Sequence, residues 1–268
     1  MEESELKKLR ARLSDLAAMS ERGITASTAF LSLSEQKYGA EWINHMGFVS
    51  RAFFYGGYPH AERKCVFFLP DFYEASVPDI TDFNAVTSVI GEELEEKIKA
   101  IEICGSGFRT LSHRDYLGAL LNLGIDRAAL GDICPTSDFS SVVFAAAPVA
   151  ALIMTSCDKI GADKVKVKIL PENFGFKYER KTKPVCGTVA SDRFDSVLAS
   201  LIGESREKAK EKILAGFAEL CGETVAKPDA RVSPGDTVSA RGHGKFIIDD
   251  ITSETKKGRI RLVARKYI

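Results

Sequence analysis

Cations that could bind phosphate groups are concentrated near the end of the chain. The 268 residues contain 37 Lys and Arg and 37 Asp and Glu, yet the segment from Lys181 to Ile268 contains 17 basic and 12 acidic residues. A basic segment beside an acidic remainder is typical of a face that binds a polyanion, although an ordinary solvated surface would have the same composition. The candidate nucleic-acid-binding residues in this segment are Arg193, Ser205, Arg206, Lys210, Arg241, Lys245, Arg259 and Arg261.

Two short helices are expected to position the first of these residues. Ser191 can cap a helix in which apolar residues from Phe194 to Ile202 recur at i, i+3, i+4, i+7 and i+8, and Gly203 is placed to end it. Ser205 can cap a second helix that reaches Gly216.

The cations of the second helix and of the β segment after it have a spacing that suits phosphate binding. Arg206 and Lys210 are four residues apart and are therefore neighbours on one helix face, and a phosphate at Arg206 would also meet free N–H groups of the first turn. The sequence from Arg241 to Lys245 places two glycines among basic residues, which permits close approach of a nucleic acid. In Arg259–Ile268, alternate arginines and Tyr267 fall on one face of a predicted strand.

The middle of the chain has a βαββαβ alternation. The expected strands are residues 100–104, 131–135, 141–145 and 164–170, and the expected helices are residues 112–123 and 148–160. This order is typical of a ferredoxin-like or RRM-like sheet with helices on one face and the other face open. RNA-binding sheets of this kind carry aromatic residues on the open face, but Phe144 is the only aromatic residue in these strands, so a structural role is favoured.

The remaining segments complete an α+β protein of three predicted domains. The N-terminal part is expected to form helices at about residues 2–19 and 26–40, the second capped by Thr25 or Ser27, and strands at residues 51–55 and 64–69. Prolines mark a boundary near residue 78, and the polar residues 171–190 are typical of a linker. We therefore predict an N-terminal α/β domain at 1–78, an RRM-like domain at 79–178 and a C-terminal domain at 186–268.

His113-Arg114-Asp115 is the tripeptide of the protein-kinase catalytic loop. That pattern also requires an Asn five residues after Asp115 and a DFG triplet, and the chain has neither. The residues fit better the start of a helix that Ser112 caps, where His113 or Arg114 contacts a partner or a neighbouring domain. The segment Gly105–Gly107 lacks the pattern of a phosphate-binding loop and is interpreted as a turn between strand and helix.

The sequence predicts neither a metal site nor a cofactor. The six cysteines form no C-x-x-C pair, and the four histidines lack metal-ligand spacing. The first residues lack the apolar region of a signal peptide, and the longest apolar run, residues 142–154, is too short to span a bilayer. We therefore expect a cytoplasmic protein with no membrane span.

Several residues of the C-terminal segment follow a known order. They are Arg193 and Asp195 as an R-x-D pair, Ser205-Arg206, the turn glycines Gly216 and Gly222, and Pro234-Gly235-Asp236. On these residues the segment resembles the S4 RNA-binding domain, which implies binding to structured RNA. The departures from the S4 pattern are Phe194 for leucine, Ala218 for valine and Cys221 for asparagine.

Two further stretches widen the resemblance. They are YGGYPHAER, from Tyr55 to Arg63, and LSHRDYLGALLNLGIDRAALGDI, from Leu111 to Ile133. With GHGKF at residues 242–246, they resemble the YlmH family over most of the chain. The resemblance implies a bacterial protein with an N-terminal α/β domain, an RRM-like middle and a C-terminal S4 domain. It also implies rRNA of the large ribosomal subunit and peptidyl-tRNA as partners in rescue of stalled translation, and an association with cell division.

We therefore predict a non-catalytic, monomeric RNA-binding protein. S4 domains also accompany pseudouridine synthases and tyrosyl-tRNA synthetases, so an RNA-modifying enzyme is the main alternative, although the chain has no HIGH or KMSKS signature. A third hypothesis is an adaptor that binds a division protein through the acidic N-terminal domains.

Overall fold

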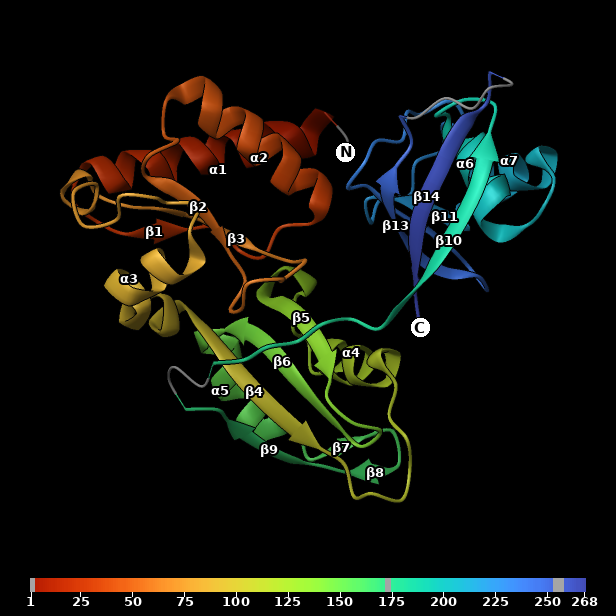
Figure 1. Cartoon of the computed structure of the whole chain (residues 1–268). Coiled ribbons are helices and arrows are strands. Elements are labelled where there is room, and N and C mark those ends of the chain that lie inside the picture. Colours follow the sequence, from red (N-terminus) through yellow and green to blue (C-terminus); the bar gives the residue numbers. More distant parts are fainter. Residues whose placement is uncertain (1–2, 172–174, 253–257) are drawn as a thin grey trace. The chain divides into compact units, whose positions relative to one another are not determined.

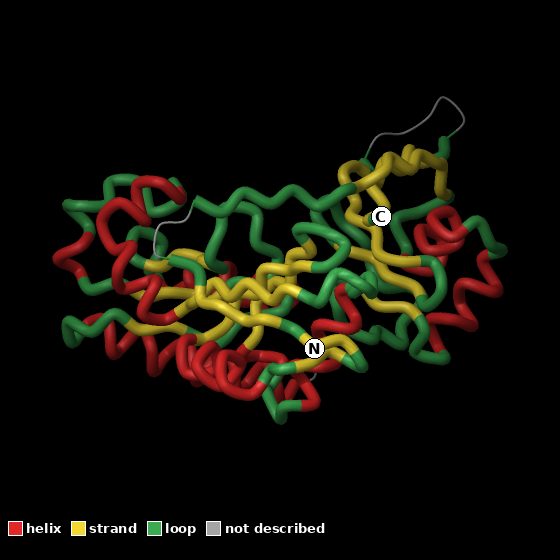
Figure 2. Tube along the Cα trace, turned by 90° about the horizontal axis from the view of Figure 1, so that it is seen from below, coloured by secondary structure: helices red, strands yellow, loops and turns green. Residues whose placement is uncertain are grey.

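The computed structural model describes residues 3–171, 175–252 and 258–268. Helices combine with several sheets, as expected for the α+β class, and the chain divides into unit 1, residues 1–178, and unit 2, residues 179–268 (Figure 1). Figure 2 shows helices and strands in both units. The further division of unit 1 at residue 78 stays a prediction. Among the described residues, no helix has the length and apolar character needed to cross a membrane.

The N-terminal part of unit 1 packs two helices against a small sheet. The helices are α1 (Glu3–Glu21) and α2 (Leu33–Met46), and the strands are β1 (Ala26–Ser27), β2 (Ala52–Tyr55) and β3 (Cys65–Phe68), followed by the short helix η1 (Asp71–Tyr73). Strand β3 lies between β1 and β2. Leu13 of α1, Trp42 of α2 and Phe68 of β3 are buried in one core cluster.

The second helix begins later than predicted. Residues 26–27 pair with β3 instead of starting a helix, so the expected cap at Thr25 or Ser27 is wrong. Ser32 is the cap: its Oγ accepts from the Glu35 N–H at 3.3 Å, and the Glu35 carboxylate accepts from the Ser32 N–H at 2.7 Å. This reciprocal capping satisfies two backbone donors, which is a stronger helix start than a lone hydroxyl provides.

A helix that the sequence analysis missed precedes the middle sheet. Helix α3 (Phe83–Lys97) begins at Asp82, whose carboxylate accepts from two backbone N–H groups. Val86, Ile90 and Leu94 recur every four residues and are buried. The helical spacing of apolar residues was therefore present in the sequence, but the prolines and aspartates of the preceding segment were interpreted as a domain boundary.

The middle of unit 1 has the expected βαββαβ order. The strands β4 (Ile98–Cys104), β5 (Leu130–Pro135), β6 (Ser140–Ala146) and β9 (Lys166–Ile169) form one sheet in the order β5-β6-β4-β9. Helices α4 (His113–Asn122) and α5 (Ala147–Ser156) share a core cluster with it, and η2 (Arg127–Ala129) leads into β5. Helix α5 ends four residues before the predicted end, because residues 159–164 form the hairpin of β7 (Lys159–Ile160) and β8 (Asp163–Lys164).

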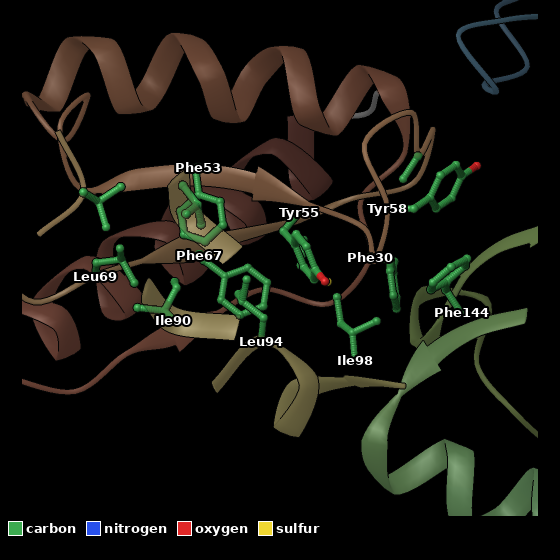
Figure 3. Packing of buried hydrophobic residues seen from close by; sticks show 14 of the residues in the cluster. Phe30, Phe53, Tyr55, Tyr58, Phe67, Leu69, Ile90, Leu94, Ile98 and Phe144 are labelled. Carbon is green, nitrogen blue, oxygen red and sulfur yellow. The ribbon is translucent and has the colours of Figure 1, made fainter. Parts of the chain in front are cut away.

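The face of this sheet that lacks α4 and α5 is covered around Phe144. Phe144 is 2% exposed and stacks on Tyr58 with ring centroids 5.1 Å apart. Figure 3 shows Phe144 beside Phe30 and Tyr58. The expectation of an open face is therefore wrong at this position, and Phe144 is not accessible to a nucleic-acid base.

A buried carboxylate holds the covering loop in place. Asp132 of β5 accepts hydrogen bonds from the Tyr58 hydroxyl at 2.7 Å and from the backbone N–H groups of Glu62 and Arg63 at 2.7 and 3.1 Å. Burial, and then the Asp132 charge, raise the pKa of the Tyr58 hydroxyl, so Tyr58 remains a neutral donor. The Arg63 guanidinium donates to the carbonyls of Phe30 and Leu130 at 2.8 and 3.0 Å.

Unit 2 packs two helices on one face of a five-stranded antiparallel sheet. The strands are β10 (Thr182–Val189), β11 (Ala218–Leu220), β12 (Thr237–Ala240), β13 (Gly244–Asp250) and β14 (Ile260–Tyr267), in the order β10-β14-β13-β12-β11. Helices α6 (Phe194–Ile202) and α7 (Arg206–Leu214) bury Phe194, Leu198 and Ile213 against Phe246 and Leu262 of the sheet.

Two predictions for the start of unit 2 are wrong. Residues 182–189 were assigned to a linker, but they form β10, paired with β14 along its whole length. Ser191 does not cap α6: the N-cap position belongs to Arg193, and the Ser191 hydroxyl is buried with no hydrogen-bond partner among the described residues. The predicted end of α6 is confirmed, because Gly203 has the left-handed conformation with φ of 69°.

The close approach of Gly57 to Phe144 gives a test of the packing in unit 1. Gly57 has φ of +96°, and a Cβ there would lie 2.2 Å from Cδ1 of Phe144. We expect Gly57→Ala to lower the free energy of unfolding of unit 1 by about 1–3 kcal/mol, because it overpacks the core and strains the backbone. A urea titration followed by the fluorescence of Trp42, the one tryptophan in the chain, measures this change.

Gly118→Ala is the matched control. Gly118 lies in α4 with open space around the added methyl group, so this variant is expected to be stabilised by about 0.5–1 kcal/mol. Equal stability of Gly57→Ala and the wild type would contradict the packing described for this loop.

Candidate nucleic-acid interface

The N-terminus of α7 has the predicted local structure. The Ser205 hydroxyl accepts from the Lys208 N–H at 3.3 Å and caps the helix. Ala209 and Ile213 face the core, and Arg206 and Lys210 are exposed. The cap prediction is confirmed, and it fixes the direction in which the first turn of α7 points.

Two predicted phosphate-binding arginines share a buried carboxylate. Asp195 accepts from Nε and Nη2 of Arg193 at 3.3 and 3.1 Å and from Nη2 of Arg206 at 3.0 Å. The Asp195 side chain is 4% exposed, whereas those of Arg193 and Arg206 are 39% and 50% exposed. The carboxylate therefore lies beneath the arginines, and the two guanidinium groups keep a side toward solvent.

The charges around Asp195 favour its ionised form. Burial by itself would raise the pKa of the Asp195 carboxyl, but hydrogen bonds from Arg193 and Arg206 outweigh it and hold the pKa below its ordinary value. The negative charge of Asp195 is thus outnumbered by the positive charges of Arg193 and Arg206. These three side chains together keep a net charge of about +1, and the guanidinium donors are held in place before any ligand binds.

Lys210 differs from these arginines in its surroundings. It is exposed on α7 one turn after Arg206 and makes no ion pair with any described residue. Its ammonium group is therefore available to a phosphate without breaking an internal contact.

The glycine-containing turn between β12 and β13 also carries cations. Gly242 and Gly244 both have positive φ, at 85° and 88°, which the turn requires. Arg241 lies over the ring of Phe217, with its Cζ atom 5.4 Å from the ring centroid, and Lys245 lies 5.6 Å from the ring centroid of Tyr267. These contacts hold both cations against aromatic rings.

The turn is close to the loop between α6 and α7. Nε2 of His243 lies 3.3 Å from a carboxylate oxygen of Glu204, and Nζ of Lys212 lies 3.4 Å from the same oxygen. Glu204 thus connects the glycine turn to α7.

Arg261 and Arg265 of β14, and Arg259 just before it, are exposed, but Arg259 and Arg265 bind other residues of unit 2. Arg259 donates to the carbonyl of Thr188 at 3.0 Å, and Arg265 binds both carboxylate oxygens of Asp249 at 2.8 to 3.1 Å. Arg261 makes no ion pair with any residue that the structure describes. Of these three, Arg261 has the guanidinium group most available to RNA.

The predicted residues lie on two sides of unit 2. Leu262 and Ala264 of β14 face the core that α6 and α7 cover, so Arg261 and Tyr267 lie on the opposite face of the sheet. Arg193, Arg206 and Lys210 belong to the helical side. The sequence periodicities identified both groups, but they could not show that the sheet separates them.

One basic residue on the sheet side was missed by the sequence analysis. Arg180 lies 5.5 Å from the ring centroid of Tyr267. It falls in the segment assigned to a linker, as does Lys183, which is exposed on β10 but pairs with Lys266 on the face that Leu262 and Ala264 share. The β-branched residues of Thr182–Val189 were the signal that could have indicated a strand there.

The departure from the S4 pattern at Cys221 has a structural account. Cys221 has φ of 55°, a conformation that asparagine tolerates better than most residues, and its thiol lies 3.2 Å from Oδ1 of Asp236. Asp236 is buried and also accepts from the Ser233 N–H at 2.8 Å. A side-chain contact is therefore kept at this turn despite the change of residue type.

The kinase-like tripeptide of α4 is a helix start. The Ser112 hydroxyl accepts from the Asp115 N–H, and the Asp115 carboxylate accepts from the N–H and hydroxyl of Ser112. The hydrogen bonds from Ser112 lower the pKa of Asp115. His113 and Arg114 are exposed on this first turn, and their contact with a partner stays a prediction.

Within the described residues, no group of three or more His, Cys, Asp and Glu side chains is arranged to hold a metal ion.

The chain is similar to known proteins. Residues 92–173 match a family model described as "Putative RNA-binding domain in YlmH". The chain is 28% identical over 213 residues to the ribosome-associated protein quality control protein P2 of Bacillus subtilis, which covers 78% of this chain and 75% of that protein.

The predicted resemblance to the YlmH family is confirmed. A solved structure of the cell division protein ylmH from Streptococcus pneumoniae is also similar, with a TM-score of 0.47 and 18% identity over 64% of this chain and 94% of that one. The YlmH family match lies in unit 1, from the end of α3 through β9. The candidate nucleic-acid-binding residues predicted from the sequence all lie in unit 2.

Removing the charge of Asp195 tests the arginine cluster. Because the folded state lowers its pKa, Asp195 contributes stability that is present above its unfolded pKa of about 4 and is lost as the pH falls through the folded pKa. We expect Asp195→Asn to destabilise unit 2 by about 2 kcal/mol at pH 7 and by less as the pH falls below about 4. Hydrogen exchange of the α6 and α7 amides measures the change.

Asp249→Asn is the control, since Asp249 pairs with Arg265 at the surface and its loss is expected to cost less than about 1 kcal/mol. Equal effects of the two variants, or an Asp195→Asn effect that does not change with pH, would contradict the role given to Asp195.

Proposed function

We propose that this chain is a non-catalytic protein that binds structured RNA, with rRNA of the large ribosomal subunit and peptidyl-tRNA as ligands, in the rescue of stalled translation. In this proposal the protein acts as a monomer in the cytoplasm, and unit 2 is an S4-type module. The middle of unit 1 is an RRM-like domain within a three-domain architecture. The relative named as a ribosome-associated quality control protein supports the ribosomal part of this proposal.

The observation that carries the proposal is the cationic surface of unit 2. Arg193 and Arg206 are held in place by Asp195, and Lys210 lies one turn further along α7 with no internal ion pair among the described residues. Fixed guanidinium groups beside a free ammonium group suit the phosphates of a folded RNA, because little side-chain entropy is lost on binding. Ser205 orients the first turn of α7 toward the same ligand.

The Asp195 cluster also argues against the enzyme alternative. A pseudouridine-synthase-like mechanism needs an aspartate that reaches the RNA, and the R-x-D segment of this sequence that resembles a synthase's catalytic motif is Arg193 to Asp195. Asp195 is 4% exposed and binds two arginines, so its carboxylate cannot approach a base. A division-protein partner stays a prediction, since no contact within either unit bears on it.

Single cations provide the test of this function. Arg206→Ala would remove a phosphate contact and a partner of Asp195 together, so Lys210→Ala is the cleaner change on the helical side. We expect Lys210→Ala and, on the sheet side, Arg261→Ala each to weaken binding to a folded rRNA fragment severalfold. Each is also expected to lower the slope of log K against log salt concentration by about one unit. Fluorescence anisotropy over a series of salt concentrations measures both quantities.

Lys8→Ala is the control, because Lys8 is an exposed lysine of α1 in unit 1. Its binding and salt slope are expected to match those of the wild type. If Lys210→Ala and Arg261→Ala both match the wild type as well, the interface on unit 2 is wrong. If only one of them has an effect, the other side of unit 2 is removed from the interface.

A further inference from the structure

Unit 1 carries an aromatic side chain whose exposure its own fold does not explain. Phe108 lies in the loop between β4 and α4 and is 96% exposed. Full exposure of a phenylalanine forgoes the gain of about 2 kcal/mol that burial provides. A partner outside the fold is indicated here by what surrounds the ring.

The loop that carries Phe108 is held by specific contacts. Asp163 of β8 is buried, and its carboxylate accepts hydrogen bonds from the N–H of Ser106, at 3.1 Å, and from the Ser106 hydroxyl. The Gly105 N–H donates to the carbonyl of Phe139 at 2.7 Å, and a Cβ at Gly105 would lie 2.6 Å from Oδ2 of Asp163. The N–H of Phe108 donates to Ser106 Oγ at 3.4 Å. Phe108 therefore projects from a turn whose backbone is held in place by these hydrogen bonds.

Cations surround the base of this loop. Figure 1 shows the loop after β4 running beside β7 and β8. Lys159 and Lys164 are directly paired across that hairpin, and both are exposed without an ion-pair partner among the described residues. Arg109 follows Phe108 and lies beside the turn at Gly161, because its Nη1 atom is 3.6 Å from the position that a Cβ on Gly161 would occupy. Its Nη2 atom also lies 4.0 Å from a carboxylate oxygen of Asp115, at the start of α4. Lys166 of β9 lies directly opposite Cys104 of β4 in the sheet, and the loop begins after Cys104.

The charge pattern indicates a polyanion as the partner. Like charges directly opposite each other on two strands repel, so the pair Lys159 and Lys164 is destabilising until an anion lies between or beside them. An exposed aromatic ring among cations is the arrangement by which proteins bind single-stranded nucleic acid, because the ring stacks on a base while the cations contact the phosphates. A purely apolar protein partner would gain nothing from these charges.

We propose that Phe108 stacks on an unpaired RNA base and that Arg109, Lys159, Lys164 and Lys166 bind the adjoining phosphates. This second contact rests on the proposed RNA-binding function and extends it to unit 1. It lies within residues 92–173, although the buried Phe144 of the same segment cannot stack on a base. The ligand is an unpaired nucleotide, which differs from the folded RNA proposed for unit 2.

The test uses the full chain and a fluorescent RNA hairpin with an unpaired loop. Phe108→Ala and Phe108→Leu are expected to weaken binding about tenfold, because neither side chain can stack, and Phe108→Trp is expected to keep or improve it. Phe72→Ala is the matched control, since Phe72 is 61% exposed elsewhere in unit 1, and it is expected to bind like the wild type. Replacing Lys159 and Lys164 together by Ala is expected to lower the salt slope by about 1.4 units.

The outcomes separate this contact from the interface on unit 2. If Phe108→Ala binds like the wild type while Lys210→Ala is weakened, the stacking contact is wrong and the interface on unit 2 stands. If Phe108→Leu retains the affinity that Phe108→Ala loses, the contact is apolar docking rather than base stacking, and the proposal is overturned. If the wild-type chain binds neither this hairpin nor folded rRNA, the proposed function fails together with it.

Discussion

The buried carboxylate of Asp195 determines where Arg193 and Arg206 lie on unit 2. The carboxylate is almost fully buried at the start of α6, and the N–H of Asp195 donates to the carbonyl of Pro228 at 2.9 Å. Burying a carboxylate is costly unless it is paired and hydrogen-bonded, so Arg193 and Arg206 are required by the fold before they serve any ligand. This requirement joins α6 to α7 and presents two guanidinium groups at one position. The RNA-binding surface proposed for unit 2 is in this sense a consequence of how one buried charge is neutralised.

Asp132 has the same role in unit 1. It joins the loop at Tyr58 and Arg63 to β5, and so connects the two sequence stretches on which the YlmH resemblance was based. These stretches are largely structural, since the first covers Phe144 on one face of the middle sheet and the second forms α4 on the other face and part of β5. Residues that contact a ligand are expected where internal partners are absent, and Phe108 and Lys210 meet that condition.

Local signals in the sequence predicted local structure well. The Ser205 cap, the Gly203 helix end and the Ser112 helix start are short-range patterns, and the structure has all three. Competing local signals led to errors: the capping box at Ser32 was overlooked for weaker caps nearby, and Pro184 led to the assignment of an edge strand to a linker. Long-range contacts could not be predicted. The spacing of Arg193 and Asp195 does not show that Arg206 reaches back to the same carboxylate, nor that Arg261 lies across the sheet from Lys210.

The central claim, that this chain acts on the large ribosomal subunit through a cationic surface, is tested most directly by sedimentation. A lysate that contains the tagged full chain is separated on a sucrose gradient at low salt and again at high salt. The account predicts that the protein sediments with free large subunits at low salt and returns to the top of the gradient as the salt concentration rises. A protein that stays in the free fraction at low salt while still binding other RNA would contradict the account.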